Sequence, residues 1–297
     1  MIRIVLIGCV HSSRIAFDTL VRLSGQVALV GVMTRRASAY NSDFEDLALP
    51  AKAINCPVVY VEDHADDESQ AEQIRQFAPD VVFCVGWSKL LGLKMLRLAP
   101  FGVIGYHPAA LPQNRGRHPL IWALALGLEK TASTFFVMDE GADSGGIVSQ
   151  VDVEISVEDD AKSIYSKISE LIPTQIEQIV YSLCDGQFDP VPQDNAKASY
   201  WRKRDSADGR IDWRMTATAI YNLVRALSPP YPGATASYAS ENFRVWKCTP
   251  LPLAHENIEP GKVISVSNNT FTVKCGDGAV QVLVHDLSQL PEAGAYL

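Results

Sequence analysis

The first third of the chain alternates between short apolar runs and polar stretches. Four of the apolar runs predict buried parallel strands, because a strand that is covered on both faces reads as a nearly continuous run of Val, Ile and Leu. The segments between them predict helices, so this part predicts a doubly wound, mainly parallel α/β sheet. The expected strands are Ile2–Gly8, Val27–Met33, Val58–Val61 and Asp80–Gly86; the expected helices are Arg14–Leu23, capped by Ser12 or Ser13, Glu68–Phe77, and one that Pro50 interrupts.

The middle of the chain places two polar side chains after strands. An apolar run starting at Phe101 ends at His107, and the following Pro108 cannot donate to a sheet ladder, so we expect His107 at the carboxyl end of a strand. A second strand, Thr131–Met138, leads into an acidic, glycine-rich loop with Asp143. Because the carboxyl ends of strands in an open α/β sheet frame the ligand crevice, we expect His107 and Asp143 to meet there.

The next segment completes the first domain. Residues 146–155 alternate apolar and polar positions and predict an antiparallel edge strand, followed by a long amphipathic helix that starts at Asp159 or Asp160 and ends near Cys184. Residues 185–199 have the proline, glycine and polar content of a linker.

The last part of the chain predicts a smaller, β-rich domain. A helix is expected over Thr216–Leu227, and short strands separated by turns follow to Val284, which indicates an open sheet or small barrel. We therefore predict a first domain over residues 1–187, a linker over 188–208 and a second domain over 209–297.

Composition and charge exclude several classes of protein. An apolar content of 47% with 20% charged residues is ordinary for a globular protein. A net charge of −8 argues against a nucleic-acid partner, which needs a basic face. No apolar run approaches the ~18 residues of a membrane span, and the start lacks the features of a signal peptide. Six scattered cysteines without a CxxC pair behave as free thiols, so we expect a cytoplasmic location.

Few side chains suggest chemistry by themselves. The loop after the first strand has one glycine, Gly8, where a dinucleotide fingerprint has three. No two of the six histidines have metal-binding spacing, so we expect no metal. His107 stands at a predicted crevice, and an imidazole there suits proton transfer, with Asp143 to orient it. The alternative, a histidine that only makes structural hydrogen bonds, stays open at this point. No nucleophile for covalent catalysis accompanies it.

Two motifs resemble a known family. The pattern HPAALPxxRGxxPxxWAL, followed by MDEGADSG, is similar to the catalytic segment of the N10-formyltetrahydrofolate-dependent formyltransferases, and DGRIDW with LVRALSPPYPGA resembles their second domain. The resemblance implies a Rossmann-like catalytic domain, a β-rich C-terminal domain and direct formyl transfer with His107 as the general base and Asp143 beside it. It implies a folate pocket, to which we assign Trp87, Ser88, Ala109, Ala110, Leu111, Pro112 and Asp139.

One position departs from the family pattern. The resemblance predicts asparagine at position 105, where its amide would hydrogen-bond the formyl oxygen, and this chain has Gly105. Losing one such donor costs on the order of 3–4 kcal/mol in a well-studied oxyanion hole. We expect a substitute donor, and the candidates are Asn114, a backbone N–H, protonated His107 or an ordered water. The alternative is a catalytically weak folate-binding relative.

The acceptor amine is the remaining question. The resemblance is greatest to sugar N-formyltransferases of bacterial surface-polysaccharide (lipopolysaccharide) pathways, many of which are dimers through the C-terminal domain. A nucleotide-linked amino-sugar needs a few cations and an aromatic surface, whereas a tRNA needs a long basic groove. A methionyl-tRNA formyltransferase and a formyl-folate hydrolase are the alternatives. The residues that we assign to the sugar nucleotide are Arg115, Arg117, His118, Arg225 and Tyr231.

Overall fold

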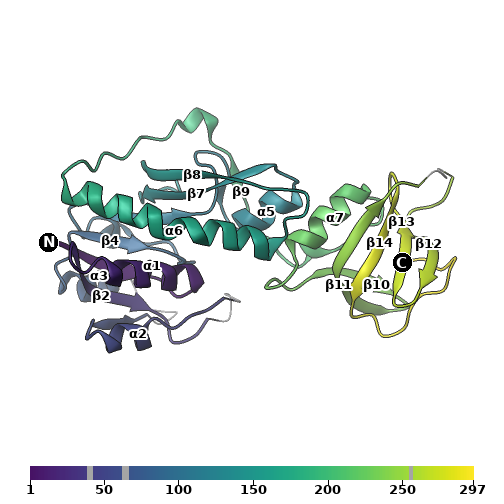
Figure 1. Ribbon diagram of the computed structural model, residues 1–297, viewed down its shortest axis with the longest axis horizontal. Coiled ribbons are helices and arrows are strands. Elements are labelled where there is room, and N and C mark those ends of the chain that lie inside the picture. Colours follow the sequence, from purple (N-terminus) through teal and green to yellow (C-terminus); the bar gives the residue numbers. More distant parts are fainter. Residues whose placement is uncertain (39–42, 62–66, 254–256) are drawn as a thin grey trace. The chain divides into compact units, whose positions relative to one another are not determined.

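The computed structural model describes residues 1–38, 43–61, 67–253 and 257–297, which form two compact units (Figure 1). Neither unit is one stretch of chain. Unit 1 consists of Met1–Gly116, Ala132–Val153 and Lys167–Tyr200, and unit 2 of Arg117–Thr131, Glu154–Ser166 and Trp201–Leu297. Residues 117–131 and 154–166 thus group with the later part of the chain, since α5 (Pro119–Ala125) packs on α7 (Ala217–Ala226). The domain boundaries that the sequence predicts, at residues 187 and 208, stay a prediction.

Unit 1 is built on a seven-stranded sheet in the order β3-β2-β1-β4-β5-β7-β8. The first five strands are parallel, as their uninterrupted apolar runs predict. β8 lies at the edge of the sheet, as the alternating pattern of residues 146–155 predicts. The strands are β1 (Ile2–Ile7), β2 (Val27–Thr34), β3 (Val58–Tyr60), β4 (Val81–Cys84), β5 (Val103–His107), β7 (Lys130–Val137) and β8 (Ile147–Glu154).

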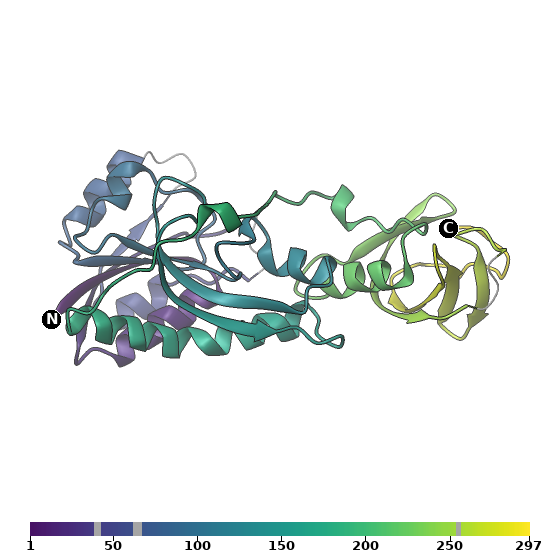
Figure 2. The ribbon, with the colours of Figure 1, turned by 90° about the horizontal axis from the view of Figure 1, so that it is seen from above.

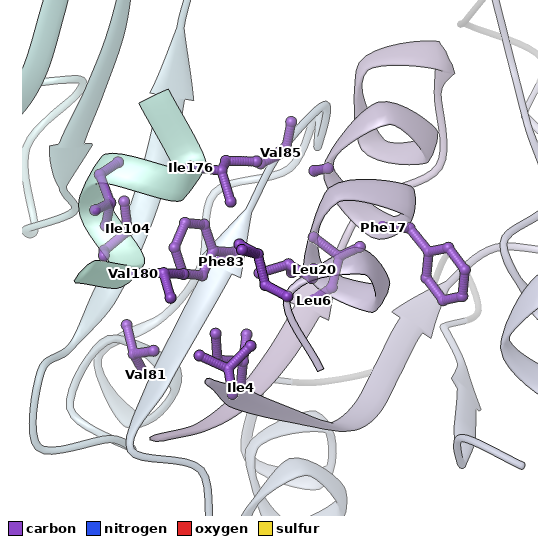
Figure 3. Close-up of a cluster of buried hydrophobic side chains, with 14 of the residues drawn as sticks. Ile4, Leu6, Phe17, Leu20, Val81, Phe83, Val85, Ile104, Ile176 and Val180 are labelled. Carbon is purple, nitrogen blue, oxygen red and sulfur yellow. The ribbon is translucent and has the colours of Figure 1, made fainter. Parts of the chain in front are cut away.

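Helices cover both faces of this sheet, which confirms the doubly wound fold. On one face, α1 (His11–Arg22) and α6 (Ala161–Cys184) enclose a cluster in which Phe83 of β4 lies between Leu20 of α1 and Ile176 of α6 (Figure 3). On the other face, α3 (Asp67–Arg75) and α4 (Leu93–Leu96) pack on alternate side chains of the same strands, among them Val5 and Val82. A strand that is buried on both faces can carry no polar alternation.

Two predicted helix boundaries are wrong. The N-cap of α1 is Val10, and Ser13 is already its third residue, where Oγ accepts from the backbone N–H of Val10 at 3.1 Å and donates to the Val85 carbonyl at 2.6 Å. Pro50 does not interrupt a helix, because it lies within the first turn of α2 (Ala48–Ala53). An N–H in that turn has no intrahelical partner to lose.

The direction of β7 changes how the two candidate loops meet. β7 is antiparallel to β5, with Thr134 opposite His107 and Val137 opposite Ile104. The loop after β7 therefore starts beside the amino-terminal end of β5 and not at its carboxyl end, in contrast to the expectation for two parallel strands. Asp143 reaches His107 only because this loop turns back toward the end of β5, as its contacts below show.

Unit 2 contains a five-stranded antiparallel sheet in the order β10-β11-β14-β13-β12, which confirms a β-rich second domain. α7 packs against β11 and β14 of this sheet (Figure 2), and the hydroxyl of Thr216 caps it by accepting from the Ala219 N–H. The sheet's strands are β10 (Ala234–Tyr238), β11 (Glu241–Leu251), β12 (Val263–Ser267), β13 (Thr270–Lys274) and β14 (Ala279–His285). Within the described ranges, no helix is long and apolar enough to cross a membrane.

Four short elements remain. The two-residue strands β6 (Arg115–Gly116) and β9 (Tyr200–Trp201) pair with each other. The 3-10 helices are η1 (Asn195–Lys197) and η2 (Ala207–Gly209). Residues 188–200, which the sequence predicts as the start of a linker, are therefore a folded part of unit 1.

Candidate functional site

His107 is the last residue of β5, as predicted, and both of its ring nitrogens face oxygen atoms. Nε2 lies 2.8 Å from the carbonyl oxygen of Asn114, and Nδ1 lies 3.6 Å from Oδ2 of Asp143. Because a carbonyl only accepts, Nε2 must carry the proton of this hydrogen bond. In the neutral ring Nδ1 is then the basic nitrogen. The His107 side chain is 7% exposed and the Asp143 side chain 20%, so the carboxylate is the more open member of the pair.

Asp143 is held by the backbone of the loop that contains it and by the backbone of the 114–116 loop. Its φ is +53°, a left-handed conformation that aspartate tolerates better than most residues. The Oδ2 atom that faces His107 also accepts from the backbone N–H of Gly116 at 2.8 Å. Asp139 is exposed and stabilises the same loop, because its Oδ1 accepts from the Ser144 hydroxyl at 2.6 Å and from the Gly141 N–H at 3.0 Å.

Asn114 meets His107 through its main chain. Its backbone is left-handed, with φ +63°, and its N–H donates to Oγ of Ser199 at 2.9 Å. The Ser199 hydroxyl also lies 3.4 Å from Oδ1 of the Asn114 side chain. Asn114 thus contacts His107 through a carbonyl oxygen, which accepts a hydrogen bond. A substitute for the family asparagine must instead donate one to the formyl oxygen.

Gly105 faces a side chain that fills the space next to it. It lies two residues before His107 in β5, so a side chain there would share the face of the sheet with the imidazole. A Cβ built at this position would lie 2.7 Å from Cγ and 3.0 Å from Sδ of Met138, and 3.1 Å from Cζ of Phe136. The thioether of Met138 therefore occupies the volume that an asparagine at position 105 would need.

Arg115, predicted to bind substrate, is 1% exposed and makes its hydrogen bonds within the protein. Nε and Nη2 donate to Oε1 of Gln193 at 3.1 and 2.7 Å, Nη2 also donates to Oδ1 of Asn195 at 2.9 Å, and Nη1 donates to the Tyr200 hydroxyl at 2.8 Å. These contacts indicate a structural role for Arg115. Its partners lie in the segment predicted as a linker and could not be predicted from sequence, because polar loop composition does not reveal what the polar groups bind.

The predicted folate-pocket residues follow β4 and β5. Trp87 is half-buried after β4, with the guanidinium of Arg35 4.9 Å from its ring centroid, and Ser88 beside it is exposed. Segment 109–112 follows His107, and buried side chains fix it: the Ala109 carbonyl accepts from the Thr134 hydroxyl at 2.7 Å, and the Leu111 carbonyl from Nε2 of Gln150 at 3.0 Å. Ala109 and Leu111 are buried, whereas Ala110 and Pro112 are half-buried.

The other predicted substrate residues belong to unit 2. Arg117 is exposed and Tyr231 half-buried. Arg225 is buried, with its guanidinium donating to Oδ1 of Asn222 and to the carbonyls of Ser156 and Asp159. The structure thus brings together His107, Asn114 and Asp143 in unit 1.

His118 is the N-cap of α5, with a left-handed φ of +56°. Its Nδ1 accepts from the backbone N–H of Arg204 at 3.3 Å. Burial lowers the pKa of His118 below its ordinary value of 6.5, and the charges of Arg117 and Arg204 lower it further. The neutral ring is therefore the form that this position favours.

Metal coordination finds no support in the described part of the chain, where no three His, Cys, Asp or Glu side chains are grouped to hold an ion. A shallow hollow in unit 2, between α7 and the 250–252 and 277–278 segments, contains none of the predicted site residues. The His107–Asp143 pair is therefore the chemistry that the described residues offer: a basic nitrogen beside a carboxylate at the end of a central strand.

Three solved structures illustrate the likeness to known proteins. HypX from Aquifex aeolicus, in complex with tetrahydrofolic acid, is 17% identical with a TM-score of 0.66; the match covers 94% of this chain and 43% of that one, so this chain spans less than half the length of HypX. An N-formyltransferase from Helicobacter canadensis, in complex with folinic acid and dTDP-3-aminofucose, is 16% identical with a TM-score of 0.71 and coverages of 95% and 99%. Methionyl-tRNA formyltransferase from Clostridium thermocellum is 17% identical with a TM-score of 0.62 and coverages of 94% and 100%.

At these identities the structural likeness concerns the fold. The family models concern the sequence itself. The formyl transferase model matches residues 2–180, which include His107 and Asp143, and the model of the formyl transferase C-terminal domain matches residues 203–291. Together they span most of the chain, including the seven-stranded and the five-stranded sheet, and the chain belongs to the formyl transferase family.

Proposed function

We propose that this protein transfers a formyl group from N10-formyltetrahydrofolate to the amino group of a nucleotide-linked amino-sugar, with His107 as the general base. The observation that carries the proposal is the pair at the end of β5, where Nδ1 of His107 faces Oδ2 of Asp143 at 3.6 Å in a chain of the formyl transferase family. A base of this kind removes the proton that an amine must lose as it becomes an amide.

The hydrogen bonds of His107 support a specific route for that proton. The Asn114 carbonyl holds the hydrogen on Nε2, so Nδ1 accepts the proton from the attacking amine. The resulting imidazolium has Asp143 beside it, and the Gly116 N–H keeps this carboxylate in place. The 3.6 Å separation is longer than an N–H···O hydrogen bond and shortens when Nδ1 carries a proton. Asp143 then helps return the proton to the leaving nitrogen.

The residues after β4 and β5 fit a reduced folate. This group supplies the formyl carbon on N10 when it is bound. Trp87 is half-buried and supplies an aromatic ring for stacking on a flat heterocycle. The half-buried Ala110 and Pro112 supply apolar surface in a segment whose backbone the Thr134 and Gln150 hydrogen bonds fix. The solved structures of HypX and the Helicobacter canadensis protein contain tetrahydrofolic acid and folinic acid, which supports the same class of donor for this chain.

The net charge of this chain favours an amino-sugar nucleotide over a tRNA as the acceptor. A net charge of −8 disfavours a tRNA, whose phosphates dominate its affinity. The Helicobacter canadensis structure contains dTDP-3-aminofucose, and its fold covers nearly the whole of both chains. We also propose a role in bacterial surface-polysaccharide synthesis. We further propose dimerisation through the C-terminal domain, which light scattering of the purified protein tests.

Mass spectrometry of the acceptor tests the function. Purified protein is incubated with N10-formyltetrahydrofolate and dTDP-, UDP- or GDP-linked amino-sugars, and one product is expected to gain one formyl group. His107→Asn is the control for catalysis by the chain itself. Formylation of initiator methionyl-tRNA instead would indicate the tRNA enzyme, and release of formate without any acceptor would indicate a hydrolase. Folate binding without turnover on any acceptor would indicate a catalytically weak folate-binding relative, which is the alternative that Gly105 raises.

A further inference from the structure

The His107–Asp143 pair is divided between two loops, and one side chain outside both loops joins them. The 114–116 loop holds His107 through the Asn114 carbonyl, and the 139–145 loop carries Asp143. Gln193, half-buried in the segment after α6, bonds to both. Its Oε1 accepts from Nε and Nη2 of Arg115, and its Nε2 donates to the carbonyls of Asp143 at 2.9 Å and Gly145 at 2.7 Å.

The two ends of the Gln193 amide do different work. The oxygen satisfies a guanidinium that is 1% exposed, and the nitrogen satisfies two backbone carbonyls of the Asp143 loop. Only an amide of this length presents an acceptor to one loop and two donors to the other. Since Asn114 and Asp143 both have left-handed backbones, the two loops need such outside support to keep their conformations.

The neighbouring residues of the same segment extend this brace. The backbone of Arg115 donates to the Ser199 carbonyl at 2.9 Å, and Val191 and Ile147 exchange backbone hydrogen bonds of 2.8 Å in both directions. Residues 191–199 therefore run alongside both loops. Gln193 is the member of this segment whose side chain contacts both Arg115 and the residue that faces His107.

We propose that Gln193 is a positioning residue of the reaction, whose amide sets the separation and orientation of the His107–Asp143 pair. This inference rests on the proposed roles of those two side chains. It assigns to a residue of the predicted linker a function that no motif indicates. A misplacement of about 1 Å in such a pair can cost on the order of a hundredfold in rate.

Gln193→Glu is the sharp variant, and Asn195→Asp is its matched control. Each replaces an amide by a carboxylate of the same shape that still accepts from the Arg115 guanidinium, and each adds one negative charge there. Only Gln193→Glu removes the donors to the Asp143 and Gly145 carbonyls. Gln193→Met removes these donors without adding a charge, and it replaces Gln193→Glu if circular dichroism shows that the latter is unfolded.

Two readouts separate positioning from simple stabilisation. We expect kcat to fall about tenfold or more in Gln193→Glu, with KM for donor and acceptor within about twofold, and all constants of Asn195→Asp within about twofold of the parent. The second readout is an NMR titration of the His107 ring, assigned with His107→Asn, which needs no substrate. Its midpoint is expected to move in Gln193→Glu relative to Asn195→Asp.

The outcomes also distinguish this inference from the proposed function. Equal titration curves and equal kcat in the two variants would overturn the positioning role. A shifted His107 titration in a protein whose parent formylates no acceptor would support positioning and reject the proposed function. A loss of kcat with an unshifted titration would overturn the inference, because the pair itself would then be unchanged.

Discussion

Replacing Gly105 by alanine tests whether Met138 fills the space next to Gly105 on the face of the sheet that His107 shares. The added Cβ would lie 2.7 Å from Cγ of Met138, and non-bonded carbons normally keep about 3.5–4.0 Å. Either Met138 or the strand must therefore move by roughly 0.8 Å or more. Gly105 is not among the glycines with positive φ, so alanine meets no backbone penalty of its own. The cost therefore arises mainly from the contacts of the new Cβ.

The magnitude follows from how far the thioether can yield. Overpacking a filled site costs about 1–3 kcal/mol, and Met138 is half-buried and flexible, so we expect about 1–2 kcal/mol for Gly105→Ala. In a Met138→Ala background the main obstacle is gone. Alanine then gains about 0.5 kcal/mol over glycine in a strand, offset in part by Phe136 at 3.1 Å. The coupling between the two positions is therefore about 2 kcal/mol.

A double-mutant cycle measures this coupling. The free energy of unfolding is obtained from urea denaturation, followed by far-UV circular dichroism, for the parent, both single variants and the double variant. A coupling below about 0.5 kcal/mol would refute the view that Met138 fills the place of a side chain at position 105. Such a result would also mean that an asparagine fits at position 105 without a substitution of Met138.

Three other predictions concern the pair, its buried support and the helix cap of unit 2. His107→Asn is expected to lower kcat by about 10²–10⁴ with an unchanged circular dichroism spectrum, and near-normal rates would remove His107 from the mechanism. Arg115→Met leaves the oxygens of Gln193 and Asn195 without their donor, so urea denaturation should show a loss of about 1–3 kcal/mol; an unchanged free energy of unfolding would contradict the structural place of Arg115. The pKa of His118 is lower in the folded than in the unfolded chain, so the folded chain binds fewer protons below the ordinary value of 6.5, and its stability falls as the pH falls through and below that value. His118→Asn suits the same left-handed backbone and does not titrate, so the parent should lose more free energy of unfolding than this variant between about pH 8 and about pH 5; equal losses would show that His118 is not the group responsible.

The fold could be predicted from sequence wherever burial alone decides. The short apolar runs of β1, β2 and β4 predicted strands covered on both faces, and His107 ends β5 because proline follows it. The direction of β7 could not be predicted, since a buried strand has the same pattern whichever way it runs. The meeting of His107 and Asp143 was expected on parallel strands and is confirmed, but by a loop that turns back.

The support of the site was beyond sequence reasoning for a different reason. In the sequence, Arg115 near His107 looks like an anion-binding residue. Only the structure shows that it is buried and that amide and phenol oxygens accept its hydrogen bonds. Gln193 has no local signal, because its partners lie 78 and 50 positions away. The same holds for Gly105, where the sequence shows the missing amide and the structure shows the methionine that takes its space.

The bonds of Gln193 also order events during synthesis. All strands of the unit 1 sheet are complete at Glu154, but the contacts that join the two loops come from residues after α6. Residues near the amino terminus leave the ribosome first, and domains generally fold as units during synthesis. A nascent chain that stops before this segment therefore contains every strand of the unit 1 sheet, with His107 and Asp143, but lacks the Gln193 hydrogen bonds that join their two loops.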